Sequence, residues 1–317
     1  MICELSVVIV NYNTRELLAD CLESLRTHLP ATEVEVIVVD NASSDGSREM
    51  VQTRFPEVRL ICSKENLGFG RANNLGVQES SGKYLFLFNS DAVLREDTAT
   101  ALRHVLEERP ETGVAGPRVL LSDNSRQPMI CGPVPSLRAM FNDALKLDKL
   151  FPGIRFFQGL HDDRPTQRVT EVGWVSGVCM LIRRKAFEQV EGFDPEFFMY
   201  CEDIDLCLRM RRFGWGVVHV DEYPIVHHCG GSSKTDAQRL RNSLMQQRYF
   251  LRMLSRDMGW LRMAAARLIL SLGLAFRIAA GAVQVLLHGR KKSLLLRSSG
   301  LRLAALWGCR FDVEGSK

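Results

Sequence analysis

The sequence predicts an α/β fold with a mostly parallel sheet flanked by helices, followed by a helical C-terminal extension. Over the first 120 residues, short apolar runs rich in β-branched side chains alternate with amphipathic stretches, which is the pattern of successive β–α units. Polar side chains stand directly after these apolar runs, and residues from about 236 onward have a helical pattern. The 317 residues are 46% hydrophobic and 25% charged, which excludes a disordered or fibrous protein.

The predicted strands of the first half are continuous apolar runs, typical of parallel strands that are buried on both faces. They cover residues 5–13, 34–40, 58–63 and 83–89. A helix is expected after each strand: the first has its apolar face at Leu17, Leu18, Cys21, Leu22 and Leu25, and the others lie near 45–55, 70–80 and 96–109. Ser43 or Ser44 is expected to cap the second helix. Right-handed crossovers then place helices on both faces of the sheet.

The second half of the chain has a less regular pattern. Prolines punctuate residues 121–167, so we expect a loop-rich segment there that folds over the site. The patterns that follow predict a strand over 171–184, a helix over 202–213, a strand over 216–220 and helices from about 236.

Charge divides the chain near residue 234. Residues 234–317 hold 16 Lys and Arg against 4 Asp and Glu, a net charge of +12, whereas the rest carries a net charge of −8. The apolar stretch 268–287 is as long as a membrane span but contains Arg277 and Gln284, so we expect it to lie on an anionic membrane surface; a soluble helical bundle and a true span are the alternatives. Nucleic acid is not an expected partner, because the basic residues are interleaved with Leu and Ala and few aromatic side chains are available to stack on bases.

The cysteines and the N-terminal region indicate the reducing cytoplasm. The nine cysteines are odd in number and form no CxxC pair, which argues against a disulfide framework or a zinc ribbon. The first apolar run lacks a basic region before it and is only six residues long, so we expect a buried strand and not a signal peptide.

Candidate ligand-binding residues stand where the predicted strands end. In open α/β sheets ligands bind beyond the carboxyl ends of the strands. The residues at these ends are Asn11, Asn13, Asp40, Asn41, Ser90 and Asp91, together with Gly68 and Gly70 in the segment ENLGFGRANN. Carboxylates there suit a ribose, a base or a hard divalent cation, and glycines permit close backbone approach. Each segment taken alone is equally typical of a tight turn or a helix cap.

Two later segments carry titratable side chains. Glu202 and Asp203 begin a predicted helix directly after the aromatic run 197–200, so we expect a raised carboxyl pKa that suits a general base. Acids at a helix N-terminus also complement the helix dipole, which is the simpler explanation. His227 and His228 stand near a strand end, where an imidazole is able to bind a metal or a phosphate, although a single histidine is more often structural.

Taken in order, these segments resemble the family 2 glycosyltransferases with the GT-A fold, in the rhamnosyltransferase-like branch of bacterial surface-polysaccharide enzymes. The matching segments are SVVIVNYN, VVDNASSDGS, NLGFGRANN, LFNSDAVL, WVSGVCMLIRR, EGFDPEFFMYCEDIDLCLR and VHHCGGSS, and they span about residues 4–233. The sheet is therefore expected to be a GT-A (Rossmann-like) sheet. The family's D-x-D element reads Asn89-Ser90-Asp91 in this chain, so its first carboxylate is absent.

The resemblance implies a role for each matching residue. Asp203 is implied as the catalytic base, and Asp91 with His227 or His228 as ligands of Mg²⁺ or Mn²⁺. The implied nucleotide contacts are Asn11, Asn13, Asp40, Asn41, Gly68, Phe69, Asn73 and Ser90. The implied contacts of the acceptor or donor sugar are Trp174, Ser176, Gly177 and Glu202. Residues 1–233 are then the catalytic domain, with a nucleotide-sugar half (1–120) and an acceptor half (121–233), and residues 234–317 are a basic amphipathic extension.

The implied activity is inverting transfer of a sugar from a nucleoside-diphosphate sugar, with dTDP-rhamnose as the first expectation, to a hydroxyl of a lipid-linked glycan. The implied location is the cytoplasm, at the inner face of the cell membrane. A second copy of the chain is a further partner that the sequence leaves open. Two alternatives remain: a sugar nucleotidyltransferase, which usually has a basic Gly-rich loop where this chain has NYNTRE, and a non-catalytic nucleotide-binding scaffold of the same fold.

Overall fold

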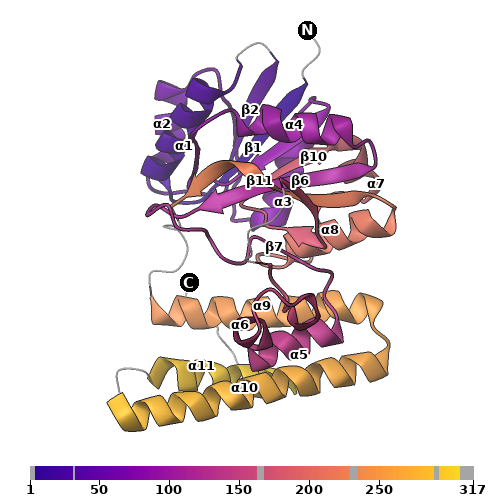
Figure 1. Cartoon of the computed structure of the whole chain (residues 1–317). Coiled ribbons are helices and arrows are strands. Elements are labelled where there is room, and N and C mark those ends of the chain that lie inside the picture. Colours follow the sequence, from indigo (N-terminus) through magenta and orange to yellow (C-terminus); the bar gives the residue numbers. More distant parts are fainter. Residues whose placement is uncertain (1–3, 31–32, 163–167, 229–234, 289–292, 308–317) are drawn as a thin grey trace. The chain divides into compact units, whose positions relative to one another are not determined.

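The computed structural model describes residues 4–30, 33–162, 168–228, 235–288 and 293–307 (Figure 1). These residues group into two compact units. The sheet unit comprises the described parts of Met1–Val134 and Asp163–Ser232, and the helical unit comprises those of Pro135–Asp162 and Ser233–Lys317. One division falls between Ser232 and Ser233, close to the expected boundary, but Pro135–Asp162, which is expected in the catalytic domain, groups with the C-terminal helices.

The sheet unit is built on a nine-stranded sheet. Its strands are β1 (Leu5–Asn11), β2 (Val34–Asp40), β3 (Arg59–Cys62), β4 (Tyr84–Phe88), β5 (Ala92–Leu94), β6 (Thr112–Leu120), β8 (Val169–Glu171), β10 (Cys179–Arg183) and β11 (Gly216–His227). Their order is β3-β2-β1-β4-β10-β6-β11-β5, with β8 paired to β11. As predicted, β1 to β4 are parallel.

The strand directions decide where the loops of the sheet meet. β10 is antiparallel to both β4 and β6, and β6 is parallel to β11. The strands β1, β2, β4, β6 and β11 therefore run in one direction. Their carboxyl ends lie at the same edge of the sheet, and β10 begins at that edge.

Helices flank the sheet, as predicted (Figure 1). They are α1 (Arg15–His28), α2 (Ser47–Arg54), α3 (Phe69–Gln78), α4 (Thr98–Glu108), α7 (Arg184–Gln189) and α8 (Glu202–Arg212). Most apolar side chains of β1, β4 and β10 are buried in the core, and those of Ile9, Leu87 and Leu181 are fully buried. α3 packs very close to the sheet, since a Cβ on Gly76 would overlap Cγ1 of Val8.

The central strands of the second half differ from the prediction. β6 has no strand signal in the sequence, because Gly113, Gly116 and Pro117 disfavour a strand. The glycines are needed because the neighbouring side chains are close: a Cβ on Gly113 would lie 2.9 Å from Cβ of Trp215, and one on Gly116 would lie 2.7 Å from Cβ of Val175.

Other boundaries also differ. The strand expected over 171–184 is three short strands, β8, β9 (Trp174–Val175) and β10, because β9 pairs separately with β7 (Cys131–Gly132). The strand expected over 216–220 continues to residue 227 through an irregularity between Val220 and Ile225. Ser43 and Ser44 do not cap α2, whose N-cap is Gly46 without a side-chain hydrogen bond.

The helical unit contains α5 (Leu137–Leu145), α6 (Leu147–Leu150), the 3₁₀ turn Arg155–Phe157, α9 (Asp236–Asp257), α10 (Trp260–His288) and α11 (Ser293–Leu306). The segment 121–167, expected as loop, thus includes two helices. α5 and α10 pack closely, because a Cβ on Gly273 would lie 2.8 Å from Cβ of Ala144. Arg277 also pairs with Asp143 across this contact, at 3.8 Å. The extension after residue 234 is helical, as expected.

Candidate active site

The loops after β1 and β2 are joined by a buried polar network. Asn11 Nδ2 donates to Asp40 Oδ1 (3.1 Å) and to Ser43 Oγ (3.0 Å). The other oxygen of Asp40, Oδ2, accepts from Arg48 Nε (2.6 Å) and from the Ser43 backbone N–H (3.1 Å). Asp40 and Asn11 are both buried. Their side chains therefore fix the two strand ends to each other, which is a structural role beside any contact with a nucleotide.

This network extends to the loop after β4. Thr14 Oγ1 donates to Asn11 Oδ1 (2.7 Å) and lies 2.9 Å from Ser90 Oγ. Asn13 has a positive φ of 54°, and its Oδ1 accepts from the Ser44 backbone N–H at 2.8 Å. The side chain of Asn13 is exposed, whereas Asn11 and Ser90 are buried.

The loop that contains Gly68 is hydrogen-bonded to Phe198, in the segment that precedes the predicted catalytic base Asp203. The Phe69 backbone N–H donates to the Phe198 carbonyl oxygen at 2.9 Å. A Cβ on Gly68, whose φ is +80°, would overlap that same oxygen, so only glycine fits there. Asn41 holds the loop from the other side: its Oδ1 accepts from Leu67 N–H (2.8 Å), and its Nδ2 donates to the Gly68 carbonyl (3.2 Å).

Asn73 supports the same loop from inside α3. Its Nδ2 donates to the Phe69 carbonyl oxygen at 3.0 Å, and the residue is buried. The Phe69 ring in turn lies over Gly177, since a Cβ there would be 3.0 Å from Phe69 Cε1. Gly68, Phe69, Asn73 and Gly177 are therefore gathered in one place.

Asp203 stands in the first turn of α8 and accepts two backbone hydrogen bonds. Gly177 N–H donates to its Oδ2 and Ile204 N–H to its Oδ1, each at 2.8 Å. The chain enters α8 through two residues in the left-handed region, Tyr200 (φ 74°) and Cys201 (φ 67°). Such backbone conformations cost about 1–3 kcal/mol each in non-glycine residues and often occur at functional sites.

Glu202 and Asp203 differ in their surroundings. Burial raises the pKa of Asp203, opposed by the hydrogen bonds from Gly177 and Ile204 that favour its charged form. Burial, and after it the charge of Asp203, raises the pKa of Glu202 well above its ordinary value. Among the described residues Oε2 of Glu202 is buried without a hydrogen-bond partner. As the pH rises, we therefore expect Asp203 to lose its proton before Glu202 does.

Trp174 and Ser176 lie beside this group. Trp174 is 3% exposed and belongs to the hydrophobic core, so most of its surface faces apolar side chains and not solvent. Ser176 follows β9, and its backbone N–H donates to the Ile130 carbonyl oxygen at 2.8 Å. Of the implied sugar contacts, Gly177 and Glu202 are the ones directly beside or bonded to Asp203.

Asp91 and His227 face each other. β11 ends at His227, which pairs with Ala92 of β5. The imidazole Nε2 of His227 lies 2.9 Å from Asp91 Oδ1, and both side chains are largely buried, at 10% and 15% exposure. His228 contacts Asp91 through its backbone N–H, which donates to the Asp91 carbonyl oxygen at 2.8 Å, and its ring Nδ1 lies 2.9 Å from Ser122 Oγ.

Asp91 and Asp203 are linked through a short series of backbone contacts. The Asn89 N–H, in the turn that carries Asp91, donates to the Val178 carbonyl oxygen at 3.0 Å. Val178 follows Gly177, whose N–H binds Asp203. Both acids thus lie at the edge of the sheet where β4 and β11 end and β10 begins.

Asp91 and His227 are chemically suited to hold a divalent cation between them. Their facing atoms, an imidazole nitrogen and a carboxylate oxygen that now lie within hydrogen-bond distance at 2.9 Å, are groups that would bind a divalent cation together. The described residues contain no group of three or more His, Cys, Asp or Glu that would hold a metal alone. Diphosphate oxygens and water are the ligands that such an ion usually adds.

Several supporting residues have no signal in the sequence. Ser122 contacts His228, and Thr14 contacts Ser90, because separate loops come together at the sheet edge. Arg48 contacts Asp40 from eight residues further along the chain. Gln127 is a further example, since its Oε1 lies 2.8 Å from His227 Nδ1. Local spacing in the sequence does not predict such contacts.

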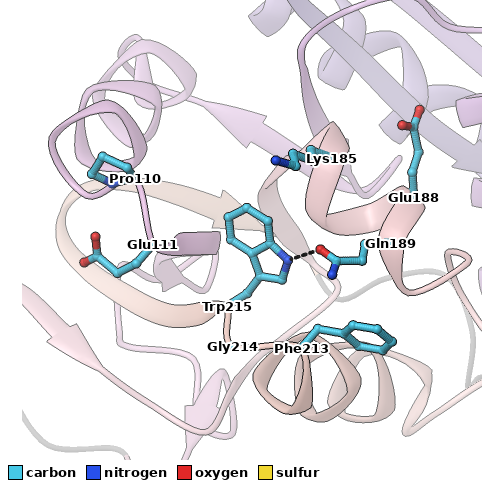
Figure 2. A pocket seen from close by; sticks show the side chains of 8 residues that line it. All are labelled: Pro110, Glu111, Lys185, Glu188, Gln189, Phe213, Gly214 and Trp215. Carbon is cyan, nitrogen blue, oxygen red and sulfur yellow. Dashed lines mark hydrogen bonds between the residues drawn. The ribbon is translucent and has the colours of Figure 1, made fainter.

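A separate cavity of about 840 Å³ lies at the opposite edge of the sheet (Figure 2). It is lined by Pro110, Glu111, Lys185, Glu188, Gln189, Phe213, Gly214 and Trp215. The Trp215 indole N–H donates to Gln189 Oε1 at 2.9 Å, as Figure 2 shows. β6 and β11 begin here and β10 ends here, so the cavity is distinct from the edge that carries Asp91 and Asp203.

Comparison with known proteins agrees with this architecture. The family model described as "Glycosyl transferase family 2" matches residues 6–191, and that of "Glycosyl transferase family group 2" matches residues 154–306. An N-acetylglucosaminyl-diphospho-decaprenol L-rhamnosyltransferase of Mycobacterium tuberculosis is 32% identical over 81% of this chain and 86% of its own length. Rhamnosyltransferase WbbL of Escherichia coli is 26% identical over 70% of this chain and 83% of its own.

A solved structure supports the fold. The mannosyltransferase PcManGT of Pyrobaculum calidifontis, in complex with GDP-Man and Mn²⁺, aligns with a TM-score of 0.58 at 16% identity, over 95% of this chain and 86% of that one. The chain belongs to glycosyl transferase family 2, and it is a rhamnosyltransferase-like glycosyltransferase built on a GT-A sheet.

Proposed function

We propose that this glycosyltransferase moves a rhamnosyl residue from dTDP-rhamnose to a hydroxyl of a lipid-linked glycan, with inversion at the anomeric carbon. The observation that carries the proposal is the position of Asp203. Its carboxylate is held by the Gly177 N–H, and the same segment is bonded to the turn that carries Asp91. A proton acceptor and a diphosphate-binding group are then available at one edge of the sheet.

Asp203 is the proposed base. Its carboxylate accepts the proton of the acceptor hydroxyl while the acceptor oxygen bonds to the anomeric carbon and the bond to the diphosphate breaks. Backbone N–H groups fix the orientation of the carboxylate, and its raised pKa makes it a stronger proton acceptor than an ordinary aspartate. General-base assistance of this kind contributes typically about 10²–10⁴-fold in rate.

Glu202 is the proposed contact for a sugar hydroxyl. Its Oε2 is buried and unpartnered among the described residues, and its pKa is raised well above the ordinary value. A carboxyl held in its neutral form donates a hydrogen bond as well as accepting one. Gly177, Ser176 and Trp174 belong to the same proposed sugar side of the site.

Asp91 and His227 are the proposed ligands of Mn²⁺ or Mg²⁺. His227 is preferred over His228 because its ring nitrogen faces Asp91 at 2.9 Å, whereas the His228 ring Nδ1 faces Ser122. When bound, the cation would supply positive charge that stabilises the departing diphosphate. Asn11, Asn13, Asp40, Asn41, Gly68, Phe69, Asn73 and Ser90 are the proposed nucleotide side of the site.

The donor and acceptor are proposed from the relatives. The dTDP-rhamnosyl transferase RfbF of Shigella flexneri is 26% identical over 71% of this chain, and its name states the donor. The M. tuberculosis relative bears the name of a lipid-linked N-acetylglucosaminyl diphosphate. Together they support dTDP-rhamnose as donor and a lipid-linked glycan as acceptor in cell-surface polysaccharide synthesis.

The helical unit supports peripheral binding to the inner face of the cell membrane. Leu261, Leu268, Leu272 and Phe276 recur at helical spacing along α10 and are exposed, and Arg262 and Arg267 are exposed near them. Trp260–Ala280 is the segment among the described residues that is long and apolar enough to cross a membrane, a property that core helices of soluble proteins share. The excess of basic residues after residue 234 favours anionic lipids.

The test is the purified full chain with dTDP-rhamnose, Mn²⁺ and a synthetic N-acetylglucosaminyl diphospholipid. We expect dTDP release together with a product heavier by one rhamnosyl residue, whose anomeric configuration by ¹H NMR is opposite to that of the donor. Retention of configuration would contradict the mechanism. Formation of a nucleotide sugar from sugar phosphate and dTTP would support the nucleotidyltransferase alternative, and absence of turnover with any nucleotide sugar would support the scaffold.

A further inference from the structure

We propose that Gln127 is a positioning residue that orients the imidazole of His227 for a divalent cation bound beside Asp91. This inference rests on the metal site of the proposed function. Gln127 lies outside the motifs found in the sequence. The loop that follows β6 brings it next to His227.

Each ring nitrogen of His227 contacts the side chain of another residue. Nδ1 lies 2.8 Å from Gln127 Oε1, and Nε2 lies 2.9 Å from Asp91 Oδ1. A histidine that binds a metal through Nε2 carries its proton on Nδ1, and an amide oxygen is an acceptor for that proton. Gln127 thus stands where the supporting partner of a metal-binding histidine is expected, and Nε2 faces the carboxylate that would share the ion.

Gln127 is itself held in place. Its backbone N–H donates to the Val119 carbonyl oxygen of β6 at 3.0 Å. The preceding residue, Arg126, forms a bridge with Leu120, and its Nη2 lies 2.7 and 2.6 Å from the two carboxylate oxygens of Asp221 in β11. The loop that carries Gln127 is therefore tied to both strands next to the proposed metal site, so its amide is not free to follow the ring.

The same loop provides a matched control. Ser122 contacts the neighbouring histidine, with its Oγ 2.9 Å from His228 Nδ1. Removal of its hydroxyl disturbs the same loop and the adjacent residue but leaves the contact between Gln127 and His227 in place. Comparison of the Ser122 and Gln127 variants therefore separates a general loosening of the loop from a specific effect on His227.

The experiment measures Mn²⁺ binding to the full chain in the presence of dTDP by electron paramagnetic resonance, which follows the signal of free Mn²⁺. The variants are Gln127→Leu, which removes the acceptor, Gln127→Glu, which keeps an acceptor oxygen, and Ser122→Ala as the control. We expect Gln127→Leu to weaken Mn²⁺ affinity by about 10–100-fold, as is typical when the supporting partner of a ligand is lost. We expect Gln127→Glu and Ser122→Ala to bind Mn²⁺ nearly as the wild type does.

Electron spin-echo modulation from the ¹⁴N nuclei of a bound imidazole gives a second measurement on the same samples. We expect the modulation in the wild type and in Gln127→Glu, and a weaker one in Gln127→Leu. Equal Mn²⁺ affinity of wild type and Gln127→Leu, with thermal unfolding unchanged, would overturn the role of Gln127 and leave the metal site standing. Absence of Mn²⁺ binding in the wild type would overturn the metal site itself, and the inference with it.

Discussion

The backbone N–H of Gly177 donates a 2.8 Å hydrogen bond to Oδ2 of Asp203. This bond joins the start of β10 to the first turn of α8, so it ties the proposed base to the central sheet. The neighbouring Val178 carbonyl oxygen accepts from Asn89, in the turn that also holds Asp91. The relative position of the two acids is thus set by sheet pairing and not by flexible side chains alone.

The pair Glu202–Asp203 predicts a pH dependence of stability. Burial raises the pKa of both carboxyls in the folded protein, and that of Glu202 well above its ordinary value. The folded state therefore binds more protons than the unfolded state between the ordinary carboxyl pKa and the raised values. As a result, the free energy of unfolding falls as pH rises through that window.

We therefore expect Glu202→Gln to flatten the loss of stability above about pH 4.3, the ordinary pKa of Glu. Urea unfolding of the wild type and of the variant, measured across pH 4–9, checks this. Asp20→Asn is the control, because Asp20 lies exposed on α1. Parallel pH profiles for the wild type and Glu202→Gln would contradict a raised pKa at Glu202.

Gly68 is predicted to be irreplaceable even by alanine. The new Cβ would overlap the Phe198 carbonyl oxygen and displace the hydrogen bond from Phe69 N–H, in a backbone with φ of +80°. We expect Gly68→Ala to lower the free energy of unfolding by about 2–4 kcal/mol and to reduce transfer.

The control for this substitution is Gly214→Ala. Gly214 also has a positive φ, of +88°, but a Cβ there would meet nothing within 4 Å. Gly214→Ala therefore measures the cost of backbone strain alone, which is expected to be about 1–2 kcal/mol. Thermal or urea unfolding compares the two variants, and equal losses would show that the contact with Phe198 contributes nothing.

Removal of divalent cations is predicted to stop transfer reversibly. Asp91 and His227, the two proposed ligands, would hold the cation together with diphosphate and water, so a strong chelator is expected to compete effectively. Rhamnosyl transfer is measured in EDTA and again after excess Mn²⁺ or Mg²⁺ is added. A full rate in EDTA would contradict a metal-dependent departure of the diphosphate.

Membrane binding is predicted to depend on the exposed face of α10. Leu268 and Leu272 are exposed one turn apart, and burial of each in lipid contributes about 1.5–3 kcal/mol. We expect the double substitution Leu268→Gln and Leu272→Gln to reduce flotation with anionic liposomes at least tenfold. High salt is expected to weaken binding of the wild type, since basic side chains contribute. Equal flotation of wild type and variant would contradict the proposed surface.

The sequence predicts most of the framework because strand and helix periodicities are local. The parallel strands β1 to β4 follow from their apolar runs, and helix α8 follows from the acidic residues in its first turn, which complement the helix dipole. β6 is different, because Gly113 and Gly116 weaken its strand pattern and the sequence does not predict it. These glycines are required by close side chains from distant segments, Trp215 and Val175. The helices α5 and α6 are likewise missed, because prolines on both sides indicate a loop.

Some residues of the candidate site are also predictable from local sequence pattern, and others are not. Asp91, Asp203 and His227 are found from motifs, because each occupies a strand end or a helix start that local pattern reveals. The contact between His227 and Asp91 depends on the pairing of β11 with β5, which no local pattern contains. Gln127 and Ser122 reach the site through tertiary contacts alone. The roles of all these residues in catalysis and binding stay predictions.

The most direct test of the proposed mechanism compares turnover and nucleotide binding in Asp203→Asn. The asparagine oxygen is still able to accept from the Gly177 N–H, but its NH2 group cannot accept from the Ile204 N–H. We expect the loss of that one bond at the start of α8 to leave the fold and the nucleotide side intact, while the side chain no longer accepts the acceptor proton. We predict a loss of at least about 10²-fold in kcat with an unchanged Kd for dTDP and Mn²⁺, measured on the same preparation. Turnover near that of the wild type would contradict the assignment of Asp203 as the base.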